Sequence, residues 1–72
     1  MNIKEHDRVV LTKDLPAENL DAGDVGTVVH IYKDGAAYEV EFVTLAGETV
    51  AVVTVEASDL RPISGRKLIL PR

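Results

Sequence analysis

The chain has 72 residues with no cysteine, and 46% of them are hydrophobic and 28% charged, which fits one small globular domain. The lack of cysteine excludes disulfides, thiolate catalysis and cysteine zinc sites. No apolar run approaches the ~18 residues of a membrane span, and the first residues lack the regions of a signal peptide. We therefore expect a cytoplasmic protein that does not contact a membrane.

Short strands dominate the predicted secondary structure. Valine, isoleucine and threonine (eleven, four and five residues) make up 20 of the 72 positions, and these residue types favour extended backbone. No stretch has the sustained apolar spacing of a long helix. We expect five strands, at residues 8–11, 27–32, 38–42, 48–55 and 61–63.

A long loop separates the first two predicted strands. Leu15 and Leu20 are expected to anchor it inward, and Pro16 can open a single helical turn that ends at Gly23. The run Gly23-Asp24-Val25-Gly26 then leads into a strand, whereas the glycines of a phosphate-binding loop open a helix. Its aspartate would also repel phosphate. We interpret this run as a structural turn.

The third predicted strand has the clearest pattern. Tyr38, Val40 and Phe42 alternate with two glutamates, so one face is expected to be buried and the other wet. Asp34-Gly35 precedes this strand and fits a tight hairpin, because both residues can adopt positive φ. Ala46-Gly47 is expected to form the next turn.

The fourth predicted strand departs from this alternation, because both of its alternating sets are largely apolar. A strand with one wet face should alternate. The long loop or the C-terminal tail can cover its outer face, a bulge can switch faces midway, or the face is a protein interface. The interface hypothesis assigns the partner contact to Val43, Val50, Val52 and Thr54.

Short strands, tight hairpins and a long first loop predict an all-β fold. The best match is a small SH3-like barrel of about five strands with one short helical turn, and a five-stranded OB barrel is the second choice. Residues 57–60 form a tight turn before the last strand, where Pro62 must lie on an edge because it cannot donate to a ladder. We expect the barrel to span residues 1–64 and a basic, apolar tail to span residues 65–72.

Charge is unevenly distributed along the chain. Residues 1–60 hold all twelve carboxylates and four cations, a net charge of −8, whereas residues 61–72 carry +4 and no acid. Such an acidic body repels phosphate backbones, which disfavours nucleic-acid binding. The basic residues either pair with the acidic body or extend into solvent. In the alternative interpretation they contact phosphate, through Arg61, Arg66, Lys67 and Arg72.

No set of residues predicts catalysis or metal binding. His6 and His30 are the only histidines and do not have the spacing of metal ligands. Glu39 and Glu41 lie two residues apart, a spacing that a catalytic pair on one strand face can have. Solvated glutamates on an outer strand face are the ordinary explanation of this spacing. Ser58 and Ser64 have no nucleophile motif around them. We therefore expect no enzyme activity, no cofactor and no metal.

A set of motifs runs along the chain: residues 7–12, Leu15-Pro16, residues 22–29, residues 38–42, Ala57 and Arg61-Pro62. Together these motifs resemble a family of short bacterial proteins of uncharacterised function. The resemblance covers about residues 3–63 and implies a stand-alone SH3-like barrel. The arrangement is also similar to the SH3-like domain of the nitrile hydratase β subunit, a structural and subunit-contact module whose enzyme holds its metal ligands in the other subunit.

The leading hypothesis for function is a non-catalytic protein-interaction module. It would be homodimeric or bind a partner encoded nearby, and the family resemblance adds an antitoxin or immunity role. One alternative is an RNA- or ribosome-associated barrel, because a Gly-x-x-Gly turn entering a valine-rich strand resembles the KOW-type barrels. The other alternative is an accessory domain of an enzyme complex, by analogy with the hydratase subunit.

Overall fold

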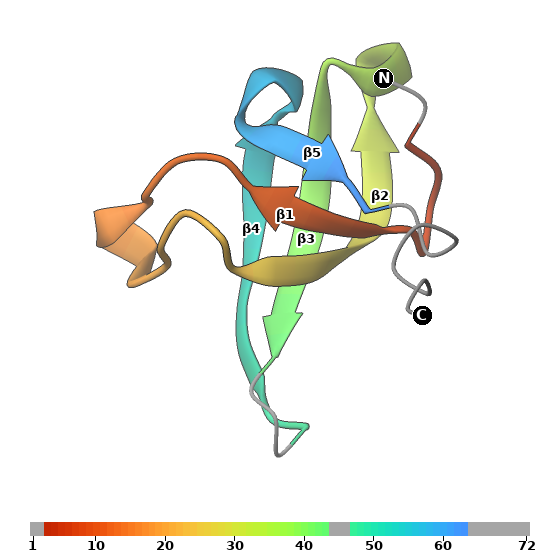
Figure 1. The fold of residues 1–72 in the computed structure, drawn as a ribbon. Helices are drawn as coiled ribbons and strands as arrows, with labels where there is room; N and C mark the ends of the chain where they lie inside the picture. The colour runs from red at the N-terminus through yellow and green to blue at the C-terminus, as the bar shows by residue number, and fades with distance from the viewer. Residues whose placement is uncertain (1–2, 44–46, 64–72) are drawn as a thin grey trace, which may run out of the picture.

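The computed structural model of the protein describes residues 3–43 and 47–63 and, for residues 49 and 50, only the backbone. Within these ranges five strands and three single 3-10 turns follow one another (Figure 1). The all-β prediction is confirmed, although there are three helical turns where one was expected. The strands are β1 (Arg8–Leu11), β2 (Val25–Tyr32), β3 (Ala37–Val43), β4 (Thr49–Glu56) and β5 (Leu60–Pro62), and the turns are η1 (Pro16–Glu18), η2 (Lys33–Gly35) and η3 (Ala57–Asp59).

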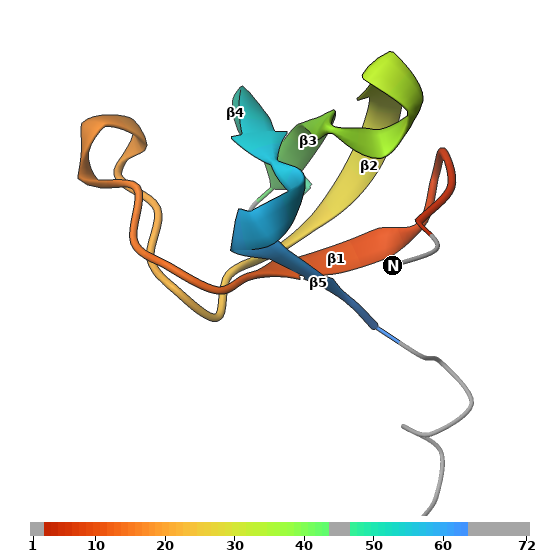
Figure 2. The same cartoon turned by 90° about the horizontal axis from the view of Figure 1, so that it is seen from above.

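The strands form one antiparallel sheet in the order β4-β3-β2-β1-β5. The long strand β2 connects its two halves, because its first part pairs with β1 and its later part with β3. Thr27 belongs to both ladders, opposite Arg8 on one side and Glu41 on the other. Figures 1 and 2 show that β1 and β5 cross over the layer of β2, β3 and β4. In the described residues no pairing between β4 and β5 closes the sheet, so the SH3-like barrel stays a prediction.

The core lies between these two layers. Val9, Val28 and Val40 are fully buried, and they come from strands β1, β2 and β3. The expected burial of Tyr38 and Phe42 is confirmed, with 3% and 2% of their surface exposed. The remaining members of the core are Ile3, Leu11, Leu20, Val55 and Leu60.

Among the glycines that the structure describes, Gly26 occupies the most crowded position. A Cβ atom there would lie 2.5 Å from Val40 Cγ1, 2.8 Å from Phe42 Cε1 and 2.9 Å from the backbone oxygen of Glu41. Gly26 lies in β2 opposite Val9 of β1, where the two layers of the sheet converge. The absence of a side chain therefore permits the close approach of the layers.

The turns differ in detail from the expected ones. The first helical turn ends at Asn19, not Gly23, because Asn19 adopts the left-handed conformation (φ 59°) and its N–H bonds to the carbonyl of Pro16. The hairpin between β2 and β3 is longer than a two-residue turn: positive φ values extend from Lys33 through Gly35. Of the next predicted turn, Ala46 lies outside the described residues.

Two sequence predictions, for the last strand and for the long loop, can be compared with the structure. β5 is an end strand, so the prediction that Pro62 lies on an edge is confirmed. The predicted inward anchoring of the long loop is also confirmed, because Leu20 is buried and Leu15 packs against the core. Leu15 and Leu20 form a small antiparallel bridge that closes the loop.

Candidate interaction surface

The layer of β2, β3 and β4 has one face on the core and one face away from it. Directly opposite residues of antiparallel strands point to the same side, so the register identifies both sets. Val28, Val40 and Val53 form one row on the inner side, and Thr27, Glu41 and Val52 form a row on the other side. We call this second side the outer face; its residues are Thr27, His30, Tyr32, Ala37, Glu39, Glu41, Val43, Val52, Thr54 and Glu56.

The large exposed apolar side chains on β3 and β4 are those of Val43 and Val52, and β2 carries two more exposed valines, Val25 and Val29. Val43 is 49% exposed and Val52 is 50% exposed, and Thr54 is exposed further along β4. These are three of the four residues predicted as a partner contact; the side chain of Val50 lies outside the described residues. The structure therefore places these three side chains where a partner can reach them, and their role as an interface stays a prediction.

Packing against the core explains only one of the two apolar sets of β4. Val53 and Val55 pack in or against the core, which accounts for the inner set. Pairing then passes from Phe42 opposite Ala51 to Val43 opposite Thr49, a shift of register at the start of β4. This shift lies at the start of β4, whereas the bulge alternative placed one midway along the strand, and it does not bury the outer set.

Cover by the long loop does not account for the outer set either. Val52 stays half exposed although the loop between β1 and β2 is fully described. The second form of cover, by the C-terminal tail, involves residues outside the described ranges. An apolar surface on β3 and β4 therefore remains without cover from any described residue.

Carboxylates accompany this apolar surface. Glu39 lies opposite Thr54, Glu41 opposite Val52, and Glu56 opposite Ala37, so all three glutamates share the outer face. Both glutamates of β3 are half buried and Glu56 is exposed. None of the outer-face positions holds lysine or arginine. The surface is therefore both apolar and negatively charged, which disfavours an anionic ligand.

A polar cluster on the β2–β3 hairpin was not anticipated from the sequence. The Tyr32 hydroxyl donates a hydrogen bond to Glu39 Oε1, and the rings of His30 and Tyr32 meet edge to face with centroids 4.5 Å apart. The hydrogen bond to Glu39 is the main reason why the pKa of Tyr32 is raised above its ordinary value, and burial and the carboxylate charge add to it. The spacing of His30 and Tyr32, two apart on one strand, was the available indication.

The other candidate residues do not converge on a site. His6 and His30 are both exposed, and the described residues contain no group of three or more potential metal ligands. The turn from Gly23 to Gly26 leads into β2, and the Asp24 carboxylate accepts a hydrogen bond from the Asp21 N–H at 2.8 Å. This arrangement agrees with a structural turn. Ser58 is exposed, and Ser64 lies outside the described residues.

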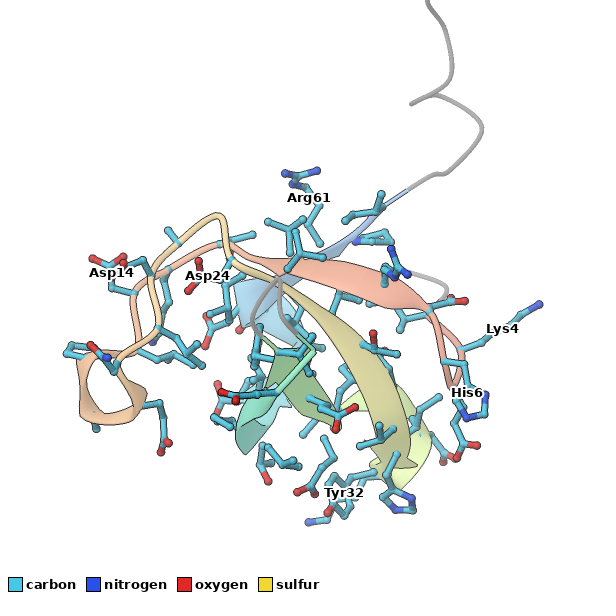
Figure 3. All side chains as sticks on the ribbon, turned by 90° about the horizontal axis from the view of Figure 1, so that it is seen from below. Lys4, His6, Asp14, Asp24, Tyr32 and Arg61 are labelled. Atoms are coloured by element: carbon cyan, nitrogen blue, oxygen red, sulfur yellow. The ribbon has the colours of Figure 1, made fainter. Side chains whose placement is uncertain are left out.

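The residues of the phosphate-contact alternative are only partly described. Arg61 is exposed on β5, opposite Val10 of β1. Figure 3 shows it on the side of the molecule opposite to Tyr32. The other three cations, Arg66, Lys67 and Arg72, lie outside the described residues.

Comparison with known proteins identifies the family of the chain. Neither the curated proteins nor the solved structures contain a match.

No helix in the described part of the chain has the length and hydropathy to span a membrane. The model of a domain of unknown function, DUF4926, matches residues 5–62, which confirms the expected membership in an uncharacterised family. The chain therefore belongs to the DUF4926 family.

Proposed function

We propose that this protein is a non-catalytic protein-interaction module. The partner, another protein or a second copy, would contact the outer face at Val43, Val52 and Thr54. The observation that carries this proposal is the pair of half-exposed valines on adjacent strands. Burying a valine side chain completely gains about 1.5 kcal/mol, so a partner that covers both gains stability from them.

The position of β4 in the sheet supports the proposal. This strand ends the sheet order and, among the residues that the structure describes, pairs with β3 alone. Its seven residues from Thr49 to Val55 carry no charge, whereas proteins usually protect a free edge with charges, proline or short length. An uncharged edge beside an apolar surface is a common template for association with another chain.

The strand arrangement also supports a relation to SH3-like barrels. The single sheet is bent at β2 so that β1 and β5 cross over the other three strands (Figure 2). We infer that the fold is of this SH3-like type and that the protein acts in the cytoplasm, with no contribution to catalysis. A contact module of this kind suits an antitoxin or immunity pair and an accessory domain of an enzyme complex alike.

Binding to RNA is the second candidate function. The observation that favours it is the exposed Arg61 at the start of a segment, residues 61–72, that carries +4 and no acid. The predicted contacts are Arg61, Arg66, Lys67 and Arg72. Such binding would weaken steeply with salt, whereas an apolar protein contact would not.

The test is an affinity capture of the tagged protein from its native lysate, followed by light scattering on the eluate. We compare the wild-type protein with Val52→Glu and with the control Val25→Glu. Val25 is 46% exposed, close to the 50% of Val52, but it lies at the start of the central strand β2, opposite Val10 of β1 and away from β4. Both variants therefore replace one half-exposed strand valine by a glutamate, and they differ in where the new carboxylate lies.

The proposal expects one stoichiometric protein partner, or a homodimer, with the wild type and with Val25→Glu. Val52→Glu should weaken the affinity for the partner at least tenfold. Burying a glutamate against an apolar partner costs more than the ~1.4 kcal/mol of binding free energy that corresponds to this factor. Equal association of all three proteins would contradict the proposal. Recovery of RNA that is lost at moderate salt would favour the second candidate.

A further inference from the structure

The exposed side chains of the outer face indicate which kind of segment can bind there. Val43 and Val52 offer apolar surface, while Glu39 and Glu56 add negative charge to the same face. Two identical copies placed face to face would bring glutamates against glutamates, which is unfavourable. The charge therefore favours an occupant that carries apolar side chains together with cations.

The same chain contains a segment of this chemistry. Residues 64–72 have the sequence Ser-Gly-Arg-Lys-Leu-Ile-Leu-Pro-Arg and lie outside the described part of the structure. Three large apolar residues, Leu68 to Leu70, are flanked by the cations Arg66, Lys67 and Arg72, and no acid interrupts them. The segment is complementary to the outer face in both charge and hydropathy.

The end of the described chain lies within reach of this face. The Ile63 N–H donates to the Arg8 carbonyl at 3.2 Å, and a row of paired residues continues around the sheet from Arg8 through Thr27 and Glu41 to Val52. Four interstrand spacings of about 4.8 Å make this path roughly 19 Å. Six extended residues beyond Ile63 span roughly 20 Å, so the apolar run of the segment can arrive at Val52.

We propose that residues 64–72 bind the outer face of their own chain, with Leu68–Leu70 against Val52 and the cations beside the outer-face carboxylates. The segment then covers the apolar surface of β3 and β4 when no partner is present. An external partner must displace it, so the segment regulates access to this surface. Only this regulatory consequence rests on the proposed function; the binding of the segment does not.

The test uses the natural absence of cysteine, so that two engineered cysteines form a single defined disulfide. In the full-length chain we compare the double variant Val52→Cys/Ile69→Cys with Val25→Cys/Ile69→Cys under mild oxidation at low protein concentration. Val25 is two strands from Arg61 through Val10 and thus closer to the end of β5 than Val52. A segment moving freely in solvent would therefore cross-link to position 25 at least as fast as to position 52.

We expect the intramolecular disulfide to position 52 to form about tenfold faster than that to position 25, because docking raises the local concentration of the thiol. Adding Arg66→Glu and Lys67→Glu should abolish this preference, and so should high salt. Equal rates, or a faster disulfide to position 25, would overturn the proposal. A disulfide-linked dimer as the main product would also overturn it, because the segment would then bind another copy.

Thermal unfolding of the reduced variants checks that each remains folded before oxidation. The rate comparison involves no lysate and no partner, so its outcome is independent of the capture experiment. If the preference for position 52 is absent while Val52→Glu still abolishes capture, the segment proposal fails and the proposed function stands. The opposite pair of results would leave the segment docked on a surface that no partner uses.

Discussion

The layer formed by β2, β3 and β4 carries valines on both its inner and its outer face, but those of the inner face pack in or against the core and those of the outer face are exposed. Val52 and Val53 are neighbours in sequence, yet Val53 packs against the core and Val52 is half exposed. The same contrast holds for Val40, which is fully buried, and Val43, which is not. Residue type therefore does not distinguish the valines that stabilise the fold from those available for association. Their position in the register does.

Crowding the inner face should have the largest effect. We expect Gly26→Ala to destabilise the fold by about 3 kcal/mol or more, because its Cβ would lie within 3 Å of side-chain atoms and of the Glu41 backbone oxygen. The backbone atom cannot move aside without disturbing the β2–β3 ladder. Chemical denaturation monitored by circular dichroism measures the change.

Gly23→Ala is the matched control for this prediction. Gly23 has a positive φ of 97° but a Cβ there would meet no atom within 4 Å. Its loss should reflect backbone strain alone, about 1–2 kcal/mol. If Gly26→Ala costs no more than Gly23→Ala, the close approach of the two layers at Gly26 does not limit stability.

Replacing one valine on each face by alanine should give the next largest difference in the free energy of unfolding. Val40→Ala should cost about 2–3 kcal/mol, because it removes two buried methyl groups and leaves a cavity. Val52→Ala should cost clearly less, about 1 kcal/mol or below, because the described residues leave Val52 half exposed and only the proposed binding of residues 64–72 covers it. Urea unfolding of both variants provides the measurement. Similar losses would mean that Val52 is covered by residues of its own chain, which would link this result to the proposed binding of residues 64–72.

The smallest expected effect concerns the polar end of the outer face. Since the neutral Tyr32 hydroxyl donates to Glu39, its ionisation is disfavoured and its pKa is raised. The Tyr32 ring signal, followed by NMR as a function of pH, should have a midpoint above the ordinary value of about 10. Glu39→Ala, which removes both the acceptor and the negative charge, should lower that midpoint. A midpoint unaffected by this substitution would show that the hydrogen bond does not persist in solution.

The raised pKa has a consequence for stability at high pH. A group whose pKa is higher in the folded state stabilises the protein fully below its unfolded pKa, and this contribution is lost as the pH rises through the folded value. Wild-type protein should therefore lose stability relative to Tyr32→Phe only above about pH 10. Denaturation of both proteins at neutral and at high pH tests this, and a difference that does not change with pH would contradict it.

Much of the fold could be predicted from residue patterns. The alternation of Tyr38, Val40 and Phe42 predicted both a strand and its buried face, and Pro62 predicted an edge. Local rules sufficed because side-chain direction follows from strand periodicity alone. The first helical turn was placed less well, since Asn19 ends it by adopting a left-handed conformation that asparagine tolerates but does not require.

The candidate surface was harder to predict. The two apolar sets of β4 indicated an anomaly, but the sequence could not separate cover, bulge and interface. Those alternatives depend on which residues of β3 lie opposite β4 and on where the register shifts. The contact between Tyr32 and Glu39 was missed for the same reason, since it requires the register of the β2–β3 hairpin.

The sequence by itself determined the all-β class, the five strands, part of the core (Leu20, Tyr38, Val40 and Phe42) and the separation of an acidic body from a basic C-terminal segment. These properties follow from composition and from the two-residue period of a strand. Only the tertiary structure decided that Gly26 lies where the two layers meet and that Val43, Val52 and three glutamates share one exposed face. Pairing register and the bend of β2 bring together residues that are distant in sequence, and no local pattern encodes that proximity.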